Sequence, residues 1–167
     1  HSWYFKPVNI NIFFARAFLQ VALESPEMLS SIHVLEQFGI KGHNAELDDE
    51  SMASGDRLFA HMKQSRETLL TYEDEDLSEG DIMSKRIAMN LMDMMIELEQ
   101  YRFHNYPVNQ MFGAQSGFPS FMESTHQVHS VRDAEDYVSR LSQAGRQFDQ
   151  VLDGLHHRET LGILPPQ

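Results

Sequence analysis

Apolar residues recur at three- and four-residue spacing along most of the chain, a pattern typical of amphipathic α-helices. The pattern predicts helices over residues 11–23 and 26–38, a third beginning near Ser51, a fourth opening at Ser78 and a last one following Ser130. No alternation of apolar and polar residues is long enough to predict a β-strand. The predicted fold class is therefore all-α, a helical bundle or array forming a single domain over residues 1–167.

The predicted helix boundaries carry their own signals. Ser25 is followed by a proline, which is typical of an N-cap with proline in the first turn. Ser78 and Ser130 each stand three residues before an aspartate, as in a capping box. Gly39 and Gly162 predict helix ends, because glycine readily takes the left-handed conformation.

Three helices have apolar faces that predict how they pack. The helix after Ser78 is apolar nearly all the way round, so we expect it to be central and buried. Its many methionines are interpreted as flexible core fillers. The last helix carries a regular apolar stripe, formed by Tyr137, Leu141, Ala144, Phe148, Val151, Leu152 and Leu155. Along the first helix, the expected apolar face consists of Phe14, Phe18, Val21 and Ala22.

The stretch over about residues 102–128 is predicted to be one long ordered loop. Glycines and prolines interrupt it at Pro107, Gly113, Gly117 and Pro119, yet it is rich in large apolar side chains. Long loops inside a domain are often functional. We expect this loop either to fold over a core or to form the wall of a cleft. Its candidate cleft residues are Tyr106, Asn109, Gln110 and Gln115.

Composition excludes several functions. The chain has 167 residues, a net charge of −12 and no cysteine. Its acidity disfavours binding to nucleic acid or to anionic lipid. The absence of cysteine excludes disulfides and thiolate chemistry. The acidic run over residues 73–76 is interpreted as a solvated turn.

Catalytic motifs are mostly absent from the sequence. None of the nine histidines begins a His-Glu-x-x-His zinc motif, and no glycine-rich phosphate loop occurs. Glu123, His126 and His129 are spaced by threes and are weak metal candidates, because that spacing would share a helix face. His156, His157 and Glu159 are better explained by the C-terminal end of a helix. We therefore predict no catalytic residue in this chain.

Several segments together resemble the bacterial domain-of-unknown-function family 885. The most specific segment is residues 106–115, which read YPVNQMFGAQ. It is followed by FPSFM at residues 118–122, by His126 and by DAEDYVSRL at residues 133–141. Three shorter segments also resemble the family. They are the turn SPE at residues 25–27, the helix start LSEGD at residues 77–81 and the closing GILPP at residues 162–166. One departure is Gln127, where related chains usually carry proline. The resemblance spans nearly the whole chain.

The resemblance implies a function for a larger protein. Family members look like zinc metallopeptidases whose zinc motif lies well downstream of the region shown, and many are exported, some as lipoproteins. By this resemblance the chain is an amino-terminal module that is inactive alone, with zinc expected in the parent protein. Its partners would be the remaining carboxy-terminal part of that protein and a peptide substrate. We expect an exported location, in the periplasm or on a lipid anchor.

A second interpretation remains open. The chain could be a stand-alone acidic helical protein-binding module of the cell envelope.

Two features of the chain ends favour a piece of a longer product instead. They are His1 in place of methionine and the closing Pro165-Pro166. In that case surfaces that meet the missing part should be apolar, and we expect a homo-oligomer through them or poor solubility.

Overall fold

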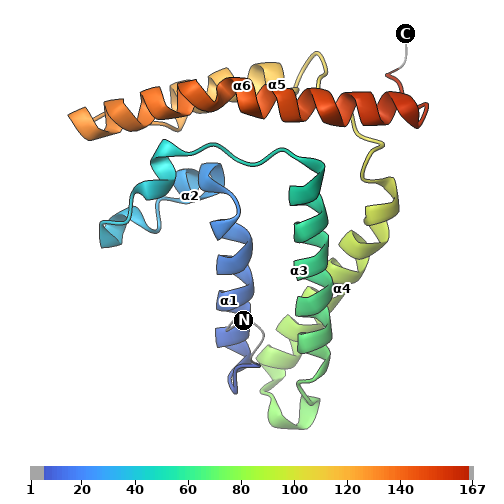
Figure 1. Ribbon diagram of the computed structural model, residues 1–167. Helices are drawn as coiled ribbons and strands as arrows, with labels where there is room; N and C mark the ends of the chain where they lie inside the picture. Colours follow the sequence, from blue (N-terminus) through green and yellow to red (C-terminus); the bar gives the residue numbers. More distant parts are fainter. Residues whose placement is uncertain (1–5, 166–167) are drawn as a thin grey trace. The chain divides into compact units, whose positions relative to one another are not determined.

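Helices make up the fold in a computed structural model that describes residues 6–165, and no strand occurs among those residues (Figure 1). The prediction of an all-α class is confirmed. The chain separates into two compact units, here called unit 1 (residues 1–21 and 55–102) and unit 2 (residues 22–54 and 103–167). The single domain over residues 1–167 stays a prediction, and each unit is described by itself. The interpretations of His1 and Pro166 concern positions outside the described residues.

Unit 1 is built around a small apolar core. Its elements are most of α1 (Ile10–Leu23), most of α3 (Met52–Leu70), η4 (Asp74–Asp76), α4 (Glu79–Leu98) and η5 (Glu99–Tyr101). The buried cluster consists of Ile10, Phe13, Leu69 and Tyr72. Phe13 and Tyr72 pack with their ring centroids 5.8 Å apart. Partly buried residues of α4, including Met89 and Met92, complete this core from one side.

The expectation that the helix after Ser78 is central and buried is wrong. No residue of α4 is buried, and Met83 and Ile87 are 59% and 54% exposed. Helix α4 packs against the core of unit 1 through only one of its sides, the side that carries Ala88, Met89 and Met92. Most of the remaining apolar side chains of α4 are exposed, namely those of Met83, Ile87, Leu91, Met94, Met95 and Leu98. Uniform apolarity therefore does not place this helix at the centre.

The buried face of α1 also differs from the expected one. Ala22 is buried as predicted, but Phe18 and Val21 are 47% and 38% exposed. The core instead takes Ile10 and Phe13, which are 2% and 6% exposed. The helix is apolar on several sides, so the spacing of its residues fits more than one face.

Unit 2 contains the remaining elements. They are α2 (Pro26–Ile32), η2 (Glu36–Phe38), η3 (Gly42–Ala45), α5 (Ala114–Ser124) and α6 (Val131–Thr160). The 30-residue α6 is unbroken at Gly145, and both α5 and η3 contact it (Figure 1). The segment predicted as one helix over residues 26–38 stops at Ile32, since His33 takes a left-handed conformation with φ 51°. Gly39, with φ 76°, ends η2 instead.

The prediction of one long loop over residues 102–128 is wrong in its second half. Residues 114–124 form α5, with Pro119 inside the helix. Proline removes one backbone hydrogen bond, but the helix is held by packing. Met122 is 4% exposed, and the ring of Phe118 packs edge-on against Phe148 at 5.8 Å. Packing against α6 therefore outweighs the local propensity of Gly117 and Pro119.

The predicted caps are confirmed at three helix starts. The hydroxyl groups of Ser25, Ser78 and Ser130 accept hydrogen bonds from backbone amides in the first turns of α2, α4 and α6. Each satisfies one of the amides that a helix start leaves unpaired. Gly162, with φ 73°, follows the end of α6, and Ile163 N donates to Arg158 O at 2.9 Å. Among the described residues, no helix combines the length and the apolarity needed to cross a membrane.

Candidate functional site

The buried side of α6 carries several polar residues beside Val151. Asp133, Arg140, Gln147 and Gly154 repeat every seven residues and are all buried. Arg140 is wholly inaccessible, with 0% exposure, whereas Leu141 and Leu152 of the predicted apolar stripe are 45% and 50% exposed. The stripe over Tyr137 to Leu155 is thus only partly correct. A charged and an amide side chain take the inward positions, so unit 2 is organised around polar contacts.

Arg140 joins three segments that are far apart in the sequence. Its Nε donates to Glu46 O at 2.9 Å, and its Nη2 donates to His43 O at 3.0 Å and to Ser30 Oγ at 2.6 Å. Its Cζ lies 4.8 Å from the centroid of the Phe121 ring. A planar guanidinium can hold several acceptors at once, which a lysine ammonium cannot do in this geometry. The side chain therefore fixes α2 and the η3 region against α6.

His126 completes the coordination of this guanidinium. Arg140 Nη1 lies 2.8 Å from His126 Nδ1, and His126 Nε2 lies 2.9 Å from the backbone oxygen of Asp133. A guanidinium only donates, so Nδ1 must accept, and a carbonyl only accepts, so Nε2 must carry the proton. The imidazole is therefore the neutral Nε2–H tautomer. Its edge also packs against Tyr137, with the ring centroids 5.2 Å apart.

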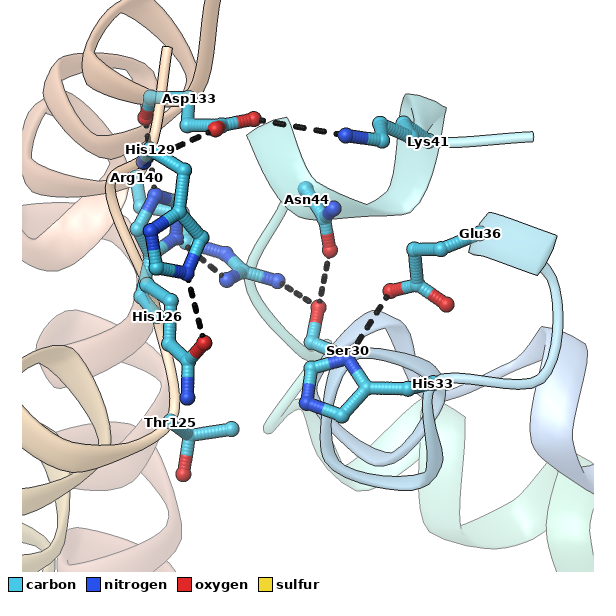
Figure 2. Close-up of a pocket in the computed structure, with 11 residues that line it drawn as sticks. Ser30, His33, Glu36, Lys41, Asn44, Thr125, His126, His129, Asp133 and Arg140 are labelled. Atoms are coloured by element: carbon cyan, nitrogen blue, oxygen red, sulfur yellow. Dashed lines mark hydrogen bonds and ion pairs between the residues drawn. The ribbon is translucent and has the colours of Figure 1, made fainter. Parts of the chain in front are cut away.

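A polar pocket of about 190 Å³ opens beside Arg140 (Figure 2). Lys41, Glu36 and His33 contribute to one side of it, and His126, His129 and Asp133 to the other. Ser30, Asn44, Thr125 and Gln127 complete its lining. The pocket mixes one exposed cation with carboxylates, imidazoles and amides, so both donors and acceptors are presented to a bound group.

Glu36 is held by two histidines. Its Oε1 lies 2.9 Å from His43 Nε2 and 3.5 Å from His33 Nδ1. Burial acts to raise the pKa of Glu36, but hydrogen bonds from His43 and His33 outweigh it and leave the pKa below its ordinary value. Its second oxygen, Oε2, and His43 Nδ1 are buried without a hydrogen-bond partner among the described residues.

Asp133 anchors the opposite side of the pocket. Its carboxylate accepts a hydrogen bond from His129 N at 3.1 Å and lies 3.7 Å from Lys41 Nζ. Hydrogen bonds from Ser130 and from the backbone of His129 hold the pKa of Asp133 below its usual value. Asp133 therefore stays charged and positions the turn that carries His126.

The hydrogen-bond arrangement favours binding over nucleophilic chemistry. Ser30 Oγ accepts from Arg140 and donates to Asn44 Oδ1 at 2.7 Å, so its proton points to an amide and not to a base. An activated serine needs a base within hydrogen-bond reach. The imidazole of His126 is committed at both nitrogens. These groups hold one another, and the pocket beside them can accept a small polar group.

The three weak metal candidates do not share a site. His126 is buried and uses both nitrogens as described, while Glu123 is exposed and His129 Nε2 contacts Gln127 Oε1 at 2.8 Å. Among residues 6–165, no three or more histidine or acidic side chains are grouped so that they could hold a metal ion. Of the C-terminal candidates, His157 packs on the Phe103 ring with centroids 4.6 Å apart. Zinc in a parent protein stays a prediction.

The four candidate cleft residues lie on the segment before α5 and at its start. Asn109 accepts hydrogen bonds from the amides of Met111 and Phe112, and the side chain of Gln115 donates to Asn109 O. The hydroxyl of Tyr106 donates to Leu164 O at 3.2 Å. Three of the four side chains therefore tie down backbone, while Gln110 is exposed. Gly113 permits this turn, since a Cβ there would lie 2.6 Å from Asn109 N.

The central residues of the pocket were missed by reasoning from the sequence. Arg140 lies three residues after Tyr137 and four before Ala144, so it falls on the expected apolar stripe. A charged side chain on an otherwise apolar helix face is the signal that could have identified Arg140, because a buried charge needs hydrogen-bond partners around it. Ser30 and Lys41 carry no comparable signal.

Comparison with known proteins gives one match. Residues 34–167 match the family described as a bacterial protein of unknown function, family 885. No curated protein and no solved structure matches the chain significantly. The match includes η2, η3, α3 to α6 and the pocket residues from Glu36 to Arg140, so this chain belongs to the bacterial family 885 of unknown function.

Proposed function

We propose that this chain is a non-catalytic helical module of a zinc-dependent peptidase-like protein, in which it acts as scaffold and forms part of the substrate-cleft wall. The supporting observation is the commitment of the Arg140 network to backbone and to neutral side chains. Four of its hydrogen bonds reach Glu46 O, His43 O, Ser30 and His126, at 2.6 to 3.0 Å. Because the guanidinium of Arg140 and its partners are paired with one another, the network supports a role in holding the surface of the module in place.

The pocket beside the network supports the role in a cleft wall. A peptide presents carbonyl oxygens, amide hydrogens and side-chain charges, and a cleft wall needs donors and acceptors that match them. Lys41, whose side chain is 40% exposed, offers a donor at the rim. Glu36 adds a carboxylate to the lining of the same pocket. The remaining carboxy-terminal part of the parent protein would carry the zinc and its activated water.

The test is peptide hydrolysis by the full-length protein. Lys41→Gln removes the rim cation, so we expect KM to rise several-fold with kcat unchanged, the signature of lost uniform binding. Arg132→Gln is the matched control, because Arg132 is exposed on α6 and does not line the pocket. A fall in kcat with unchanged KM would assign a reactive role to the pocket. Unchanged kinetics would remove the pocket from the cleft.

The second candidate is a stand-alone acidic helical protein-binding module. The outward-facing apolar side chains of α4 favour it, since Leu91 and Met95 are 52% and 42% exposed. They border an apolar groove of about 290 Å³ within unit 1. Exposed apolar patches of this kind commonly mark interaction surfaces. If this candidate is correct, Leu91→Glu should convert a self-associated chain to a monomer in light scattering, and a wild-type monomer would count against it.

A further inference from the structure

A second cavity of unit 2 combines carboxylates with aromatic rings. It measures about 250 Å³ and does not share a residue with the pocket beside Arg140. Glu27 from α2 and Glu50 from the segment before α3 border it, and Phe118 and Phe148 contribute their rings from α5 and α6. Sites for drug-sized ligands typically measure about 300–1,000 Å³. This cavity is therefore sized for a single side chain.

The aromatic part of the cavity is fixed by packing. Phe118 and Phe148 meet edge to face, with centroids 5.8 Å apart and an interplanar angle of 77°. Val151, at 8% exposure, and Pro107 extend the apolar surface. The faces of aromatic rings attract cations, and the methylene groups of a long basic side chain pack on such a surface. An apolar stem with a positive end is thus favoured.

The carboxylates of the cavity make no direct contact with a basic side chain among the described residues, and the buried guanidinium of Arg140 acts on Glu27 only at longer range. One oxygen of Glu27, Oε1, accepts hydrogen bonds from Gln147 Nε2 at 2.6 Å and Asp48 N at 3.1 Å. Among the described residues, neither Glu27 nor Glu50 lies within ion-pair distance of a basic side chain, and Glu27 Oε2 and the Glu50 carboxylate have no hydrogen-bond partner. Asp48 and Asp49 add further negative charges nearby. Desolvation and the charges of Asp48, Glu27 and Asp49 raise the pKa of Glu50.

We propose that this cavity binds the cationic side chain of a lysine or arginine residue in a peptide. The stem would lie against the Phe118 and Phe148 rings, and the charged end would meet Glu50 and the free oxygen of Glu27. Pairing would relieve the repulsion among the carboxylates. The inference concerns a cavity separate from the one in the proposed function, and binding is measured on this chain alone. Its failure therefore leaves the peptidase-module proposal intact.

Gly117 and Glu50 give two independent ways to disable the cavity. Gly117 lines it, and a Cβ at this position would meet no atom within 4 Å, so Gly117→Leu should extend a side chain into the space without a clash at Cβ. Gly145→Leu is the matched control, because Gly145 is a helical glycine with equally free space that does not line the cavity. Glu50→Gln removes one charge, and Glu46→Gln is its control on the same segment.

The experiment is a nuclear magnetic resonance titration of the 167-residue chain. The probes are three capped pentapeptides of alanine whose central residue is arginine, lysine or the neutral isostere citrulline. We expect the arginine or lysine peptide to shift signals of Gln147 and Val151, and to bind at least fivefold more tightly than the citrulline peptide. Glu50→Gln and Gly117→Leu should each weaken this binding at least fivefold, while Glu46→Gln and Gly145→Leu should retain it.

Three results would overturn the proposal. They are equal binding of the charged and citrulline peptides, shifts that map away from the cavity, and affinities that Glu50→Gln and Gly117→Leu leave unchanged. Circular dichroism melts of every variant show whether each one folds. Because Glu50→Gln removes a repelled charge without removing a described hydrogen bond, it keeps the test valid even if Gly117→Leu fails to fold.

Discussion

Arg140 donates a hydrogen bond to Nδ1 of His126 at 2.8 Å, in the interior of unit 2. Because the guanidinium cannot accept, this contact fixes which imidazole nitrogen carries the proton. The same imidazole holds the backbone oxygen of Asp133 at 2.9 Å. A buried cation, a neutral ring and the start of α6 are thereby joined in one chain of hydrogen bonds.

Replacing the guanidinium should destabilise the fold. Arg140→Lys keeps the charge but cannot serve Glu46 O, His43 O, Ser30 and His126 together, so buried acceptors lose their donors. We expect a loss of about 2–4 kcal/mol in the free energy of unfolding, measured with urea. Arg132→Lys, on the exposed side of the same helix, should change it by less than about 0.5 kcal/mol. Equal stability of the two variants would contradict the structural role of Arg140.

The tautomer of His126 can be observed directly. Nitrogen-15 chemical shifts of the imidazole should report a protonated Nε2 and an unprotonated Nδ1 at neutral pH. The signals should move in the Arg140→Met variant, since the donor to Nδ1 is then absent. A protonated Nδ1 in the wild-type chain would show that the contact with Arg140 is not formed. His129, which is exposed, serves as the internal reference.

Glu36 should make stability depend on pH in the acid range. Its hydrogen bonds with His43 and His33 lower its folded-state pKa, so its contribution is complete above its ordinary pKa of 4.5 and is lost as pH falls through the lower folded value. Glu36→Gln should therefore cost about 1 kcal/mol at pH 7. The variant and the wild type should converge as the pH falls from 4.5 through the lowered folded-state pKa of Glu36. A difference that is constant or grows toward acid would contradict this assignment.

Gln110 and Gln115 are both exposed, but only the side chain of Gln115 holds backbone in place. Gln115→Ala should lower the melting temperature by about 2–4 °C, because its side chain donates to Asn109 O and holds the turn. Gln110→Ala should leave the melting temperature unchanged and, if the segment borders the substrate cleft, should weaken peptide hydrolysis by the full-length protein. Unchanged hydrolysis in Gln110→Ala would exclude this residue from the cleft.

The helix boundaries were the most predictable part of the fold. Ser25, Ser78 and Ser130 act locally, since a side-chain oxygen three residues before an amide can cap a helix whatever the rest of the chain does. Gly162 likewise needs only its own left-handed conformation. These signals are contained in a few consecutive residues, so the sequence alone was sufficient to identify them.

Burial was less predictable, because it depends on which elements meet. Pro119 is a local helix breaker, yet contacts of Phe118 and Met122 keep it inside α5. The apolarity of α4 carries no information about how many neighbours cover it. Arg140 lies on a face that otherwise looks apolar, and its acceptors on Glu46, His43 and Ser30 come from residues 94 to 110 positions away. Local patterns cannot reveal partners at that distance.

Zinc binding by the 167-residue chain distinguishes a non-catalytic module from an enzyme that carries its own metal site. After equilibration with zinc and dialysis, elemental analysis should find less than about 0.1 zinc per chain, since His126 is committed to Arg140 and Asp133 and no grouped ligands exist among the described residues. Peptide hydrolysis by this chain should likewise be undetectable. One tightly bound zinc per chain that is lost in His126→Ala, together with hydrolysis of a peptide, would contradict the account of a non-catalytic module.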